Sequence, residues 1–398
     1  MKALALNAGS STLKAALYEV RPGVALAAPP QADWSGQIDW DPGRGAAVAM
    51  ELLRGLCEGD DPPLSSPADV DVVGHRLVHG GARFQSPTPI TAEVKEAVRA
   101  LTASAPLHNV AGLEGVAVAE RFVGDATPQI SVFDTAFHAT LPPGAHAYAG
   151  PREWLERGLR RFGFHGINHE YAAHRAAHLL HRRLEGLRLI TCHLGSGCSL
   201  AAVRDGHSVD TTMGFTPLEG LVMGTRSGSV DPGLLLHLLR EPGATVEALD
   251  TLLNHHSGLR GLSGSSGDLR EVLAARERGD PPAGLAFDVY VHRLRFHLGA
   301  MLGALGGLDA VVFTAGVGEH SPEVRAAALE PFAFLGMALD SERNAEAHAD
   351  ADIAAEGSAV RVMVISAREE WAVARAAADL VAAGAQDAAA PGAHGRDL

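Results

Sequence analysis

The sequence predicts an α/β protein built from two similar halves. Strand and helix patterns alternate along the first half, as where the helical pattern of residues 111–122 precedes the apolar run of residues 129–133. A hairpin-like stretch, LALNAGSSTLKAALYEV, recurs later in the chain as LITCHLGSGCSLAAVRDG. Each copy consists of an apolar strand, a Gly-Ser turn with hydroxyls and a second strand. This duplication indicates two domains with a nucleotide between the halves, although two unrelated hairpins could share the same sequence pattern by chance.

Composition restricts the classes of protein to which the chain belongs. Of its 398 residues, 46% are hydrophobic and 20% are charged, which is enough apolar material for large cores. The formal net charge of −14 argues against a nucleic-acid or anionic-membrane surface. The 3 cysteines are too few for a disulfide framework, and no apolar stretch approaches the roughly 18 residues of a membrane span. With no signal peptide expected ahead of the first strand, we predict a cytoplasmic protein.

The stretch NAGSSTLK separates two predicted strands, residues 3–6 and 13–20. Its simplest interpretation is the polar turn of a β-hairpin. A turn alone, however, does not need three successive hydroxyls followed by a lysine. The hydroxyls of Ser10 and Thr12, backbone N–H groups near the glycine and the ammonium of Lys14 would together form a cradle for phosphate oxygens. The sequence leaves both interpretations open.

Further elements follow in order towards a predicted domain boundary. Residues 70–74 form a short apolar strand, and Thr91 caps a helix with Glu93 in its first turn. The strand at residues 129–133 ends at Asp134. The proline- and glycine-rich stretch that follows predicts that a first domain covers residues 1–149.

The second half repeats the strand and glycine-turn order. A helix at residues 168–184 and a strand at 189–193 precede the second hairpin. A third glycine loop, AGVGEH, follows the apolar strand at 310–314, with Ser321 placed to cap the next helix. A strand, a glycine loop and a helix in this order suit the binding of a phosphate or sugar edge at a helix N-terminus.

We predict that this second domain covers residues 150–368. A last helix, residues 369–384, is stopped by its glycine and packs back on the first domain. Residues 385–398 form a flexible tail.

Long segments of the chain resemble acetate kinases over nearly the whole length. They are NAGSSTLK, GHRLVHGG, APLHN, FDTAFHATLP, RRFGFHGINHEYAA, HLGSGCSLAAV, DTTMGFTPLEGLVMGTRSGSVDP, SGDLREV, FTAGVGEHSPEVR and AREEWAVAR. The resemblance implies a two-domain fold of the actin, hexokinase and sugar-kinase type, with duplicated mixed sheets flanked by helices. It also implies a homodimer and a reversible transfer of phosphoryl between ATP and acetate by direct in-line attack of the carboxylate. The metal would be Mg²⁺, or alternatively Mn²⁺.

The chemistry of this reaction explains which side chains it needs. Acetate is ionised at neutral pH and requires no general base, but two anions must approach each other, so cations around the transferred group would offset the repulsion. Arg76 and Arg226 match the family's active-site arginines, and His165 matches its transition-state histidine. Asp134 matches the catalytic aspartate, which the family describes as an acid or base. Because acetate needs no base, we expect Asp134 to orient Mg²⁺-bound water or Arg226.

The resemblance also assigns binding roles to other residues. The metal would be held by Asn7 and Glu369, and the phosphate-facing loop would use Ser10, Thr12 and Lys14. The acetate methyl group would lie against Val78, Leu107, Phe164 and Pro217, with His108 at the border and core packing as an alternative role for that histidine. The nucleotide would contact His193, Leu194, Gly195, Ser196, Gly197, Asp268, Leu269, Arg270, Gly316, Val317, Gly318, Glu319 and His320.

The chain departs from the family pattern at three places. Ser196 replaces an asparagine of the phosphate loop, His320 replaces another near the adenine end, and Arg368 adds a cation beside Glu369. None of these changes removes a residue that bears transferred charge. Two other readings remain: a propionate or butyrate kinase of the same fold, and a non-catalytic actin-like nucleotide-binding protein. The second would not need both active-site arginines.

Overall fold

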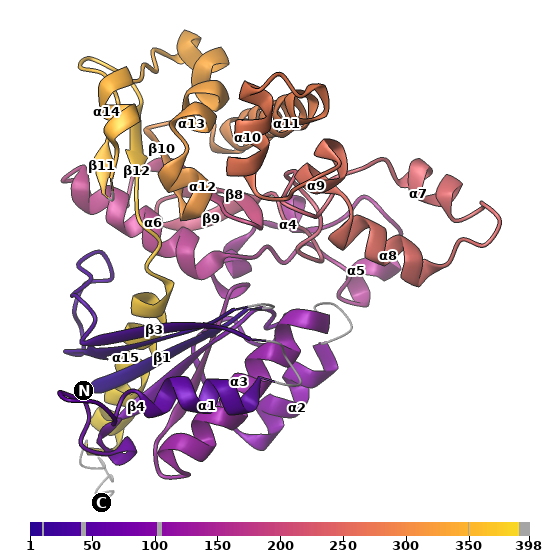
Figure 1. Cartoon of the computed structure of the whole chain (residues 1–398). Helices are drawn as coiled ribbons and strands as arrows, with labels where there is room; N and C mark the ends of the chain where they lie inside the picture. Colours follow the sequence, from indigo (N-terminus) through magenta and orange to yellow (C-terminus); the bar gives the residue numbers. More distant parts are fainter. Residues whose placement is uncertain (10–11, 41–44, 102–105, 349, 390–398) are drawn as a thin grey trace, which may run out of the picture. The chain divides into compact units, whose positions relative to one another are not determined.

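The computed structural model describes residues 1–9, 12–40, 45–101, 106–348 and 350–389, without the side chains of residues 106–108 and 386–389. The chain forms two compact units (Figure 1). Unit 1 contains Met1–Ala136 and the chain from Arg368 onward, and unit 2 contains Phe137–Ala367. The sequence predicts that the first domain ends later, at residue 149. The chain joins unit 2 earlier because the side chains of His138 and Tyr148 bond to Ser208 and Glu219 of that unit.

The two units contain sheets of the same topology. In unit 1 the order is β3-β2-β1-β4-β6-β5, and in unit 2 it is β9-β8-β7-β10-β12-β11. In each, an antiparallel meander is followed by two strands parallel to its first strand, and a two-residue edge strand closes the sheet. The recurring hairpins are β1–β2 and β7–β8, in equivalent places. The predicted α/β class with duplicated mixed sheets is therefore confirmed.

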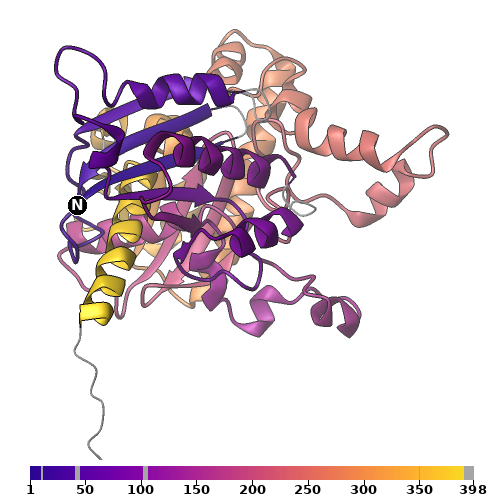
Figure 2. The ribbon, with the colours of Figure 1, turned by 90° about the horizontal axis from the view of Figure 1, so that it is seen from below.

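The sheet of unit 1 is covered on both faces because its strands are apolar on both faces. On β1, Leu4 and Leu6 pack with residues of α1 and α3 in one cluster. Ala3 and Ala5 alternate with them and face the other side, where α15 packs on β1 and β4 (Figures 1 and 2). Small side chains on that face bring the helix close, since a Cβ on Gly74 would lie 2.8 Å from Val373 Cγ1.

The same alternation organises unit 2. Cys198 at the start of β8 lies 3.7 Å from the hydroxyl of Tyr290 on α11. The next residue, Ser199, points to the opposite face and bonds to His169 of α6. Helices α11 and α6 therefore cover opposite faces of this sheet, and residues such as Thr191 and His193 of β7 face α6.

Three predicted elements differ from the structure. The glycine loop AGVGEH is a short helix, α12, which begins at Ala315 with a φ of 64°. Helix α6 begins two residues before Asn168 and ends at Leu179, ahead of the predicted end at residue 184. Gly384 does not stop α15, which continues to Ala389 because alanine-rich flanks compensate for one glycine.

The helix starts follow the capping signals in the sequence. Thr91, Asp231, Thr245, Asp268 and Ser321 each accept a hydrogen bond from a backbone N–H of the helix that they begin. None of the helices in the described part of the chain combines the length and apolarity that a membrane crossing requires.

The bounds of the elements in unit 1 are β1 Lys2–Ala8, β2 Thr12–Glu19, β3 Trp34–Asp39, α1 Ala46–Arg54, η1 Pro67–Asp69, β4 Val72–Leu77, β5 Thr88–Pro89, α2 Ala92–Ala100, α3 Pro106–Val123, β6 Gln129–Phe133 and α15 Glu369–Ala389, with η3 Ala136–Thr140 at the division. Those in unit 2 are α4 Pro143–His146, α5 Arg152–Glu156, α6 Gly166–Leu179, β7 Arg188–Leu194, β8 Cys198–Arg204, β9 His207–Thr211, α7 Pro232–Leu238, α8 Val246–His255, α9 Gly258–Ser263, α10 Leu269–Glu277, α11 Pro281–Leu305, β10 Ala310–Thr314, α12 Ala315–His320, α13 Pro322–Leu329, η4 Glu330–Leu335, α14 Ser341–Glu346, β11 Ala351–Asp352 and β12 Arg361–Val364.

The close packing of α15 on β4 yields a stability prediction. In Gly74→Ala the new Cβ would lie 2.9 Å from the carbonyl oxygen of Val373, so the helix must move. We expect the free energy of unfolding to fall by about 1–3 kcal/mol, as for other overpacked cores. Gly284→Ala is the control, because a Cβ there meets open space on α11 and alanine favours a helix. Urea unfolding of both variants measures the difference, and equal stability would contradict close packing at Gly74.

Candidate active site

The carboxyl ends of three parallel strands place polar residues at one edge of the unit 1 sheet. Asn7 lies near the end of β1, Arg76 near the end of β4, and Asp134 directly after β6. Asn7 and Arg76 are partners in the parallel register of β1 and β4. Helix α15 begins at the same edge with Glu369 and Glu370. The fold thus gathers residues from opposite ends of the chain.

Arg76 is the centre of this cluster. Its Nη2 and Nε donate to the two carboxylate oxygens of Asp134 at 2.6 and 3.1 Å, and its Nη1 donates to Asn7 Oδ1 at 3.0 Å. Nε lies 3.8 Å from Glu369 Oε2. Although burial opposes its charge, Asp134 and Glu369 raise the pKa of Arg76. The guanidinium is therefore locked in one orientation with its charge retained.

The same cluster contains carboxylate oxygens, the type of ligand that divalent cations prefer. The carboxylates of Asp134, Glu369 and Glu370 outnumber the single guanidinium. Carboxylate oxygens suit Mg²⁺, which takes one or two of them together with phosphate oxygens and water. Among the described residues, no group of three or more His, Cys, Asp or Glu side chains could hold a metal ion. The amide of Asn7 donates to Glu369 and Glu370 at 2.9 and 3.1 Å, so it holds the carboxylates in place.

Strands β1 and β2 pair antiparallel beside this cluster, up to Ala8 and Leu13. The N–H of Gly9 donates to Thr12 O at 2.9 Å. Lys14 is exposed on β2, directly opposite Asn7 in the register. Ser10, predicted to face a phosphate, lies outside the described residues. Strands β1 and β2 thus pair in antiparallel register, and Lys14 lies across from the residue that anchors the carboxylates.

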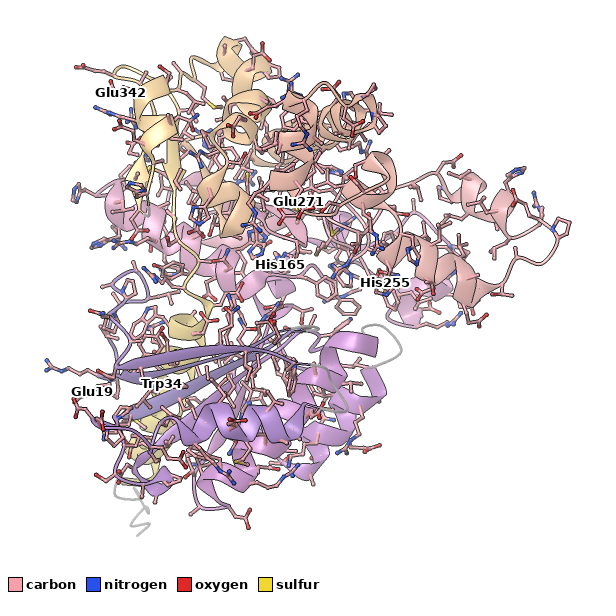
Figure 3. The ribbon with its side chains drawn as sticks, viewed as in Figure 1. Glu19, Trp34, His165, His255, Glu271 and Glu342 are labelled. Carbon is pink, nitrogen blue, oxygen red and sulfur yellow. The ribbon has the colours of Figure 1, made fainter. Side chains whose placement is uncertain are left out.

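Unit 2 brings His165, His193 and Arg226 to the second glycine turn. His165 precedes α6 with a φ of 57°, and its ring stacks on that of His193 at 4.0 Å between centroids (His165 is labelled in Figure 3). Arg226 Nη1 donates to Pro217 O at 3.1 Å, and burial lowers the pKa of this arginine. A Cβ on Gly197 would lie 3.5 Å from both Arg226 Nη1 and His165 Nε2. The two donors thus approach one point, which glycine leaves open.

A pocket of about 750 Å³ adjoins this turn in unit 2. Its wall contains the glycine turn at Gly195, helix starts α10 and α13, and helix α12. This volume suits a nucleotide-sized ligand. Predicted nucleotide residues in the wall are Gly195, Ser196, Asp268, Leu269, Arg270, Gly316, Val317 and His320. Residues that the prediction missed are Gly224, Thr225, Leu259, Gly267, Leu273, Tyr290, Ser321 and Glu323.

Other predicted nucleotide residues have different surroundings. Leu194 is buried in β7, and Gly318 packs against β10 and β7. The carboxylate of Glu319 accepts hydrogen bonds from Ser366 Oγ at 2.8 Å and from the N–H of Ala367 at 3.0 Å. Glu319 therefore anchors the segment that leads from unit 2 into α15.

The predicted acetate residues are divided between the units. Val78 lies buried in unit 1, whereas Phe164 and Pro217 belong to unit 2, with Phe164 buried. The side chains of Leu107 and His108 lie outside the described part of the structure, although α3 includes both residues.

Comparison with known proteins identifies the family. Residues 42–375 match the acetokinase family profile. The acetate kinase of Gloeobacter violaceus is 51% identical over 397 residues, which cover 94% of this chain and 98% of that protein. The chain belongs to the acetokinase family. The crystal structure of Porphyromonas gingivalis acetate kinase superposes with a TM-score of 0.84 at 36% identity, covering 96% of this chain and 99% of the other. The resemblance seen in the sequence is confirmed, and with it the predicted fold class.

Another solved structure with a similar TM-score is named for a different substrate. A propionate kinase from Francisella tularensis superposes with a TM-score of 0.83 at 34% identity, covering 95% of this chain and 99% of that one. Proteins of similar fold are thus named for different acyl substrates.

Partner residues around the site were less accessible to sequence reasoning. Glu370 bonds to Asn7, but the sequence offers only its position beside Glu369. The hydroxyl of Ser199 bonds to the rings of His165 and His169, and the ring of His169 lies edge-on to that of His193. The alternation of side chains along the strand in HLGSGCSL could have indicated Ser199. The four-residue spacing from His165 could have indicated His169, because residues four apart share a helix face.

The buried His138 supports the His165 turn and gives a pH prediction. It bonds to Ser208 Oγ at 2.8 Å and Phe164 O at 3.0 Å, and burial lowers its pKa to about 4. The unfolded chain takes up this proton near pH 6.5, so stability is full above pH 6.5 and declines as pH falls towards 4. Between pH 7.5 and 5, we expect His138→Gln to lose about 2 kcal/mol less unfolding free energy than the wild type. Urea unfolding at both pH values measures this, and equal pH dependence would contradict it.

Proposed function

We propose that this protein transfers the γ-phosphoryl group of ATP to acetate, reversibly and with Mg²⁺, giving acetyl phosphate and ADP. Membership of the acetokinase family supports the reaction class. The convergence of Arg226 Nη1 and His165 Nε2 at Gly197, beside a nucleotide-sized pocket, is the observation that carries the proposal. Cationic and polar donors fixed around an open point suit a transferring phosphoryl group.

In the proposed reaction the carboxylate of acetate attacks the γ-phosphorus directly. Acetate is already ionised, so Asp134 need not remove a proton. The phosphoryl group spreads negative charge over its equatorial oxygens, and Arg76 and Arg226 offset this charge while His165 donates a hydrogen bond. Asp134 holds the guanidinium of Arg76 by two hydrogen bonds. This supports a positioning role for Asp134 rather than acid or base catalysis.

A divalent cation completes the proposal. The carboxylate of Glu369, held by the amide of Asn7, would supply a ligand to Mg²⁺, or Mn²⁺, whose other ligands would be phosphate oxygens and water. When bound, the cation offsets charge on the β- and γ-phosphate oxygens. The side chain of Arg368 is exposed, whereas Glu369 Oε2 accepts from Asn7, which favours Glu369 as the metal ligand despite the neighbouring cation.

We also propose that the chain forms a homodimer. Helix α7 of unit 2 exposes Leu234 and Leu236, the residue after it, Leu239, is also exposed, and α8 exposes Val246 and Leu252. Apolar side chains gathered on neighbouring helices are typical of surfaces that bind another protein.

A hydroxylamine trap for acyl phosphates tests the function. Purified protein with ATP, Mg²⁺ and acetate should form acyl hydroxamate, and omission of either ATP or metal should prevent it. ATP binding without acyl phosphate would overturn the proposal and favour a non-catalytic nucleotide-binding protein.

The arginine cluster predicts a specific kinetic pattern. Arg226→Ala and Arg76→Lys should each lower kcat about a hundredfold or more, with a much smaller change in KM for ATP. Lysine retains the charge of Arg76 but cannot form the two-pronged bond to Asp134. Arg152→Ala, at an exposed surface ion pair, is the matched control and should leave kcat unchanged. Near-normal kcat in both active-site variants would exclude the proposed charge stabilisation.

The proposed contact of Val78 with the acetate methyl group predicts how a substitution at this residue changes the preference between acetate and propionate. If its methyl groups limit the pocket, the wild type should prefer acetate over propionate by about 10–200-fold in kcat/KM, as expected for one methylene. Val78→Ala should move this ratio towards propionate by about tenfold. Parallel assays with both acids measure the ratio. A wild type that prefers propionate would instead make this chain resemble the Francisella tularensis enzyme in substrate.

A further inference from the structure

Behind His165 lies a chain of four hydrogen-bonded side chains, which we call the histidine relay: Thr191, His169, Ser199 and His165. Thr191 Oγ1 lies 2.7 Å from His169 Nδ1, and Ser199 Oγ lies 2.8 Å from His169 Nε2. The same Ser199 oxygen lies 2.8 Å from His165 Nδ1. Strand β7 supplies the threonine, β8 the serine and α6 the imidazole between them, so unit 2 alone contains the relay.

The relay is closed to water and uncharged in its middle. Thr191, His169 and Ser199 are fully buried. Burial, together with the neighbouring imidazoles of His138 and His193, lowers the pKa of His169 well below its usual value. The ring of His169 therefore carries one proton, and each hydroxyl also carries one.

Because each member carries one proton, the hydrogen bonds of the relay can run in either of two directions, which we call the outward and the inward order. In the outward order, His165 donates from Nδ1, Ser199 donates to His169, and His169 donates to Thr191. The threonine proton then has only a contact to Ala201 O at 3.5 Å, the weakest in the network. In the inward order every donor is reversed, so Ser199 donates to His165 Nδ1 and the ring proton of His165 lies on Nε2.

The two orders have opposite consequences for the reaction. The Nε2 edge of His165 faces Gly197, where Arg226 Nη1 also points. In the outward order His165 could donate there only as an imidazolium, beside a guanidinium and stacked on another imidazole. In the inward order a neutral ring donates without that electrostatic cost.

We propose that the histidine relay runs inward and fixes His165 as the neutral Nε2–H tautomer, which donates to the transferring phosphoryl group. Thr191, His169 and Ser199 are then positioning residues that act through His165. The phosphoryl part of this inference rests on the proposed function, whereas the tautomer depends on the relay alone. Successive donors that point the same way also strengthen one another.

The neighbouring His193 has a comparable contact at the same ring atom. Asn168 Nδ2 lies 2.8 Å from His193 Nδ1 and 3.3 Å from Thr314 Oγ1. With the amide in this orientation, His193 Nδ1 accepts and the ring proton lies on Nε2. Each of the two stacked imidazoles thus has a buried polar group behind Nδ1, the amide of Asn168 for His193 and the hydroxyl of Ser199 for His165.

Nuclear magnetic resonance of ¹⁵N-histidine-labelled protein tests the tautomer directly. The signals of His165 are assigned by their loss in His165→Asn. We expect Nε2 to carry the proton and Nδ1 to carry none between pH 6 and 8, in protein without substrates. A proton on Nδ1, or an imidazolium at pH 7, would overturn the inward order whether or not the protein makes acyl phosphate.

Kinetics of Ser199 variants test the consequence. Ser199→Ala should mix the tautomers of His165 and lower kcat about tenfold, with KM for ATP nearly unchanged. Ser199→Thr retains the hydroxyl and should restore both the single tautomer of His165 and the wild-type kcat. Ser131→Ala, which removes an equally buried hydroxyl from β6 in unit 1, is the control and should leave the His165 signals unchanged. If Ser199→Ala matches this control in kcat and tautomer, the relay has no positioning role. If Ser199→Ala does not fold, the wild-type tautomer alone decides.

Discussion

The two-pronged bond between Arg76 and Asp134 holds the functional edge of unit 1 together. It joins β4 to the end of β6, and through Asn7 it extends to β1 and the first turn of α15. A buried guanidinium is tolerated only with such partners, and the surplus carboxylate of Glu369 is tolerated only near a cation. The same electrostatic constraint therefore orders the strand ends and positions the first turn of α15.

Unit 2 places a different set of polar residues at the equivalent end of a sheet with the same topology. Its first hairpin, β7–β8, ends in a glycine turn that leaves open the point approached by Arg226 and His165. The strand position that Asn7 occupies in unit 1 is occupied by His193 in unit 2. One copy of the duplicated unit thus carries a cluster of carboxylates, and the other carries a guanidinium and imidazoles. The proposed function requires both kinds of group, because phosphoryl transfer between two anionic substrates needs compensating charge.

Much of this organisation was accessible from the sequence because it depends on local patterns. The repeated hairpin predicted the duplicated sheets, and the family motifs located Arg76 and Arg226. The relay contacts of Ser199 were not predicted, since they depend on which face of β8 meets α6. The bonds from Glu319 to the segment before α15 were also missed, because a glycine-rich motif suggested a loop where the chain forms α12. Tertiary packing decides such contacts, and propensity alone does not.

The central claim is that phosphoryl transfer is direct, with charge supplied by fixed donors and no phosphorylated side chain. A single in-line displacement inverts the configuration at phosphorus, whereas two successive displacements retain it. The most direct measurement uses ATP with a chiral, isotopically labelled γ-thiophosphoryl group and determines the configuration of the acetyl thiophosphate formed. Inversion is expected if acetate attacks the γ-phosphorus directly. Retention would contradict direct attack and would require a side chain of this protein to carry the phosphoryl group between ATP and acetate.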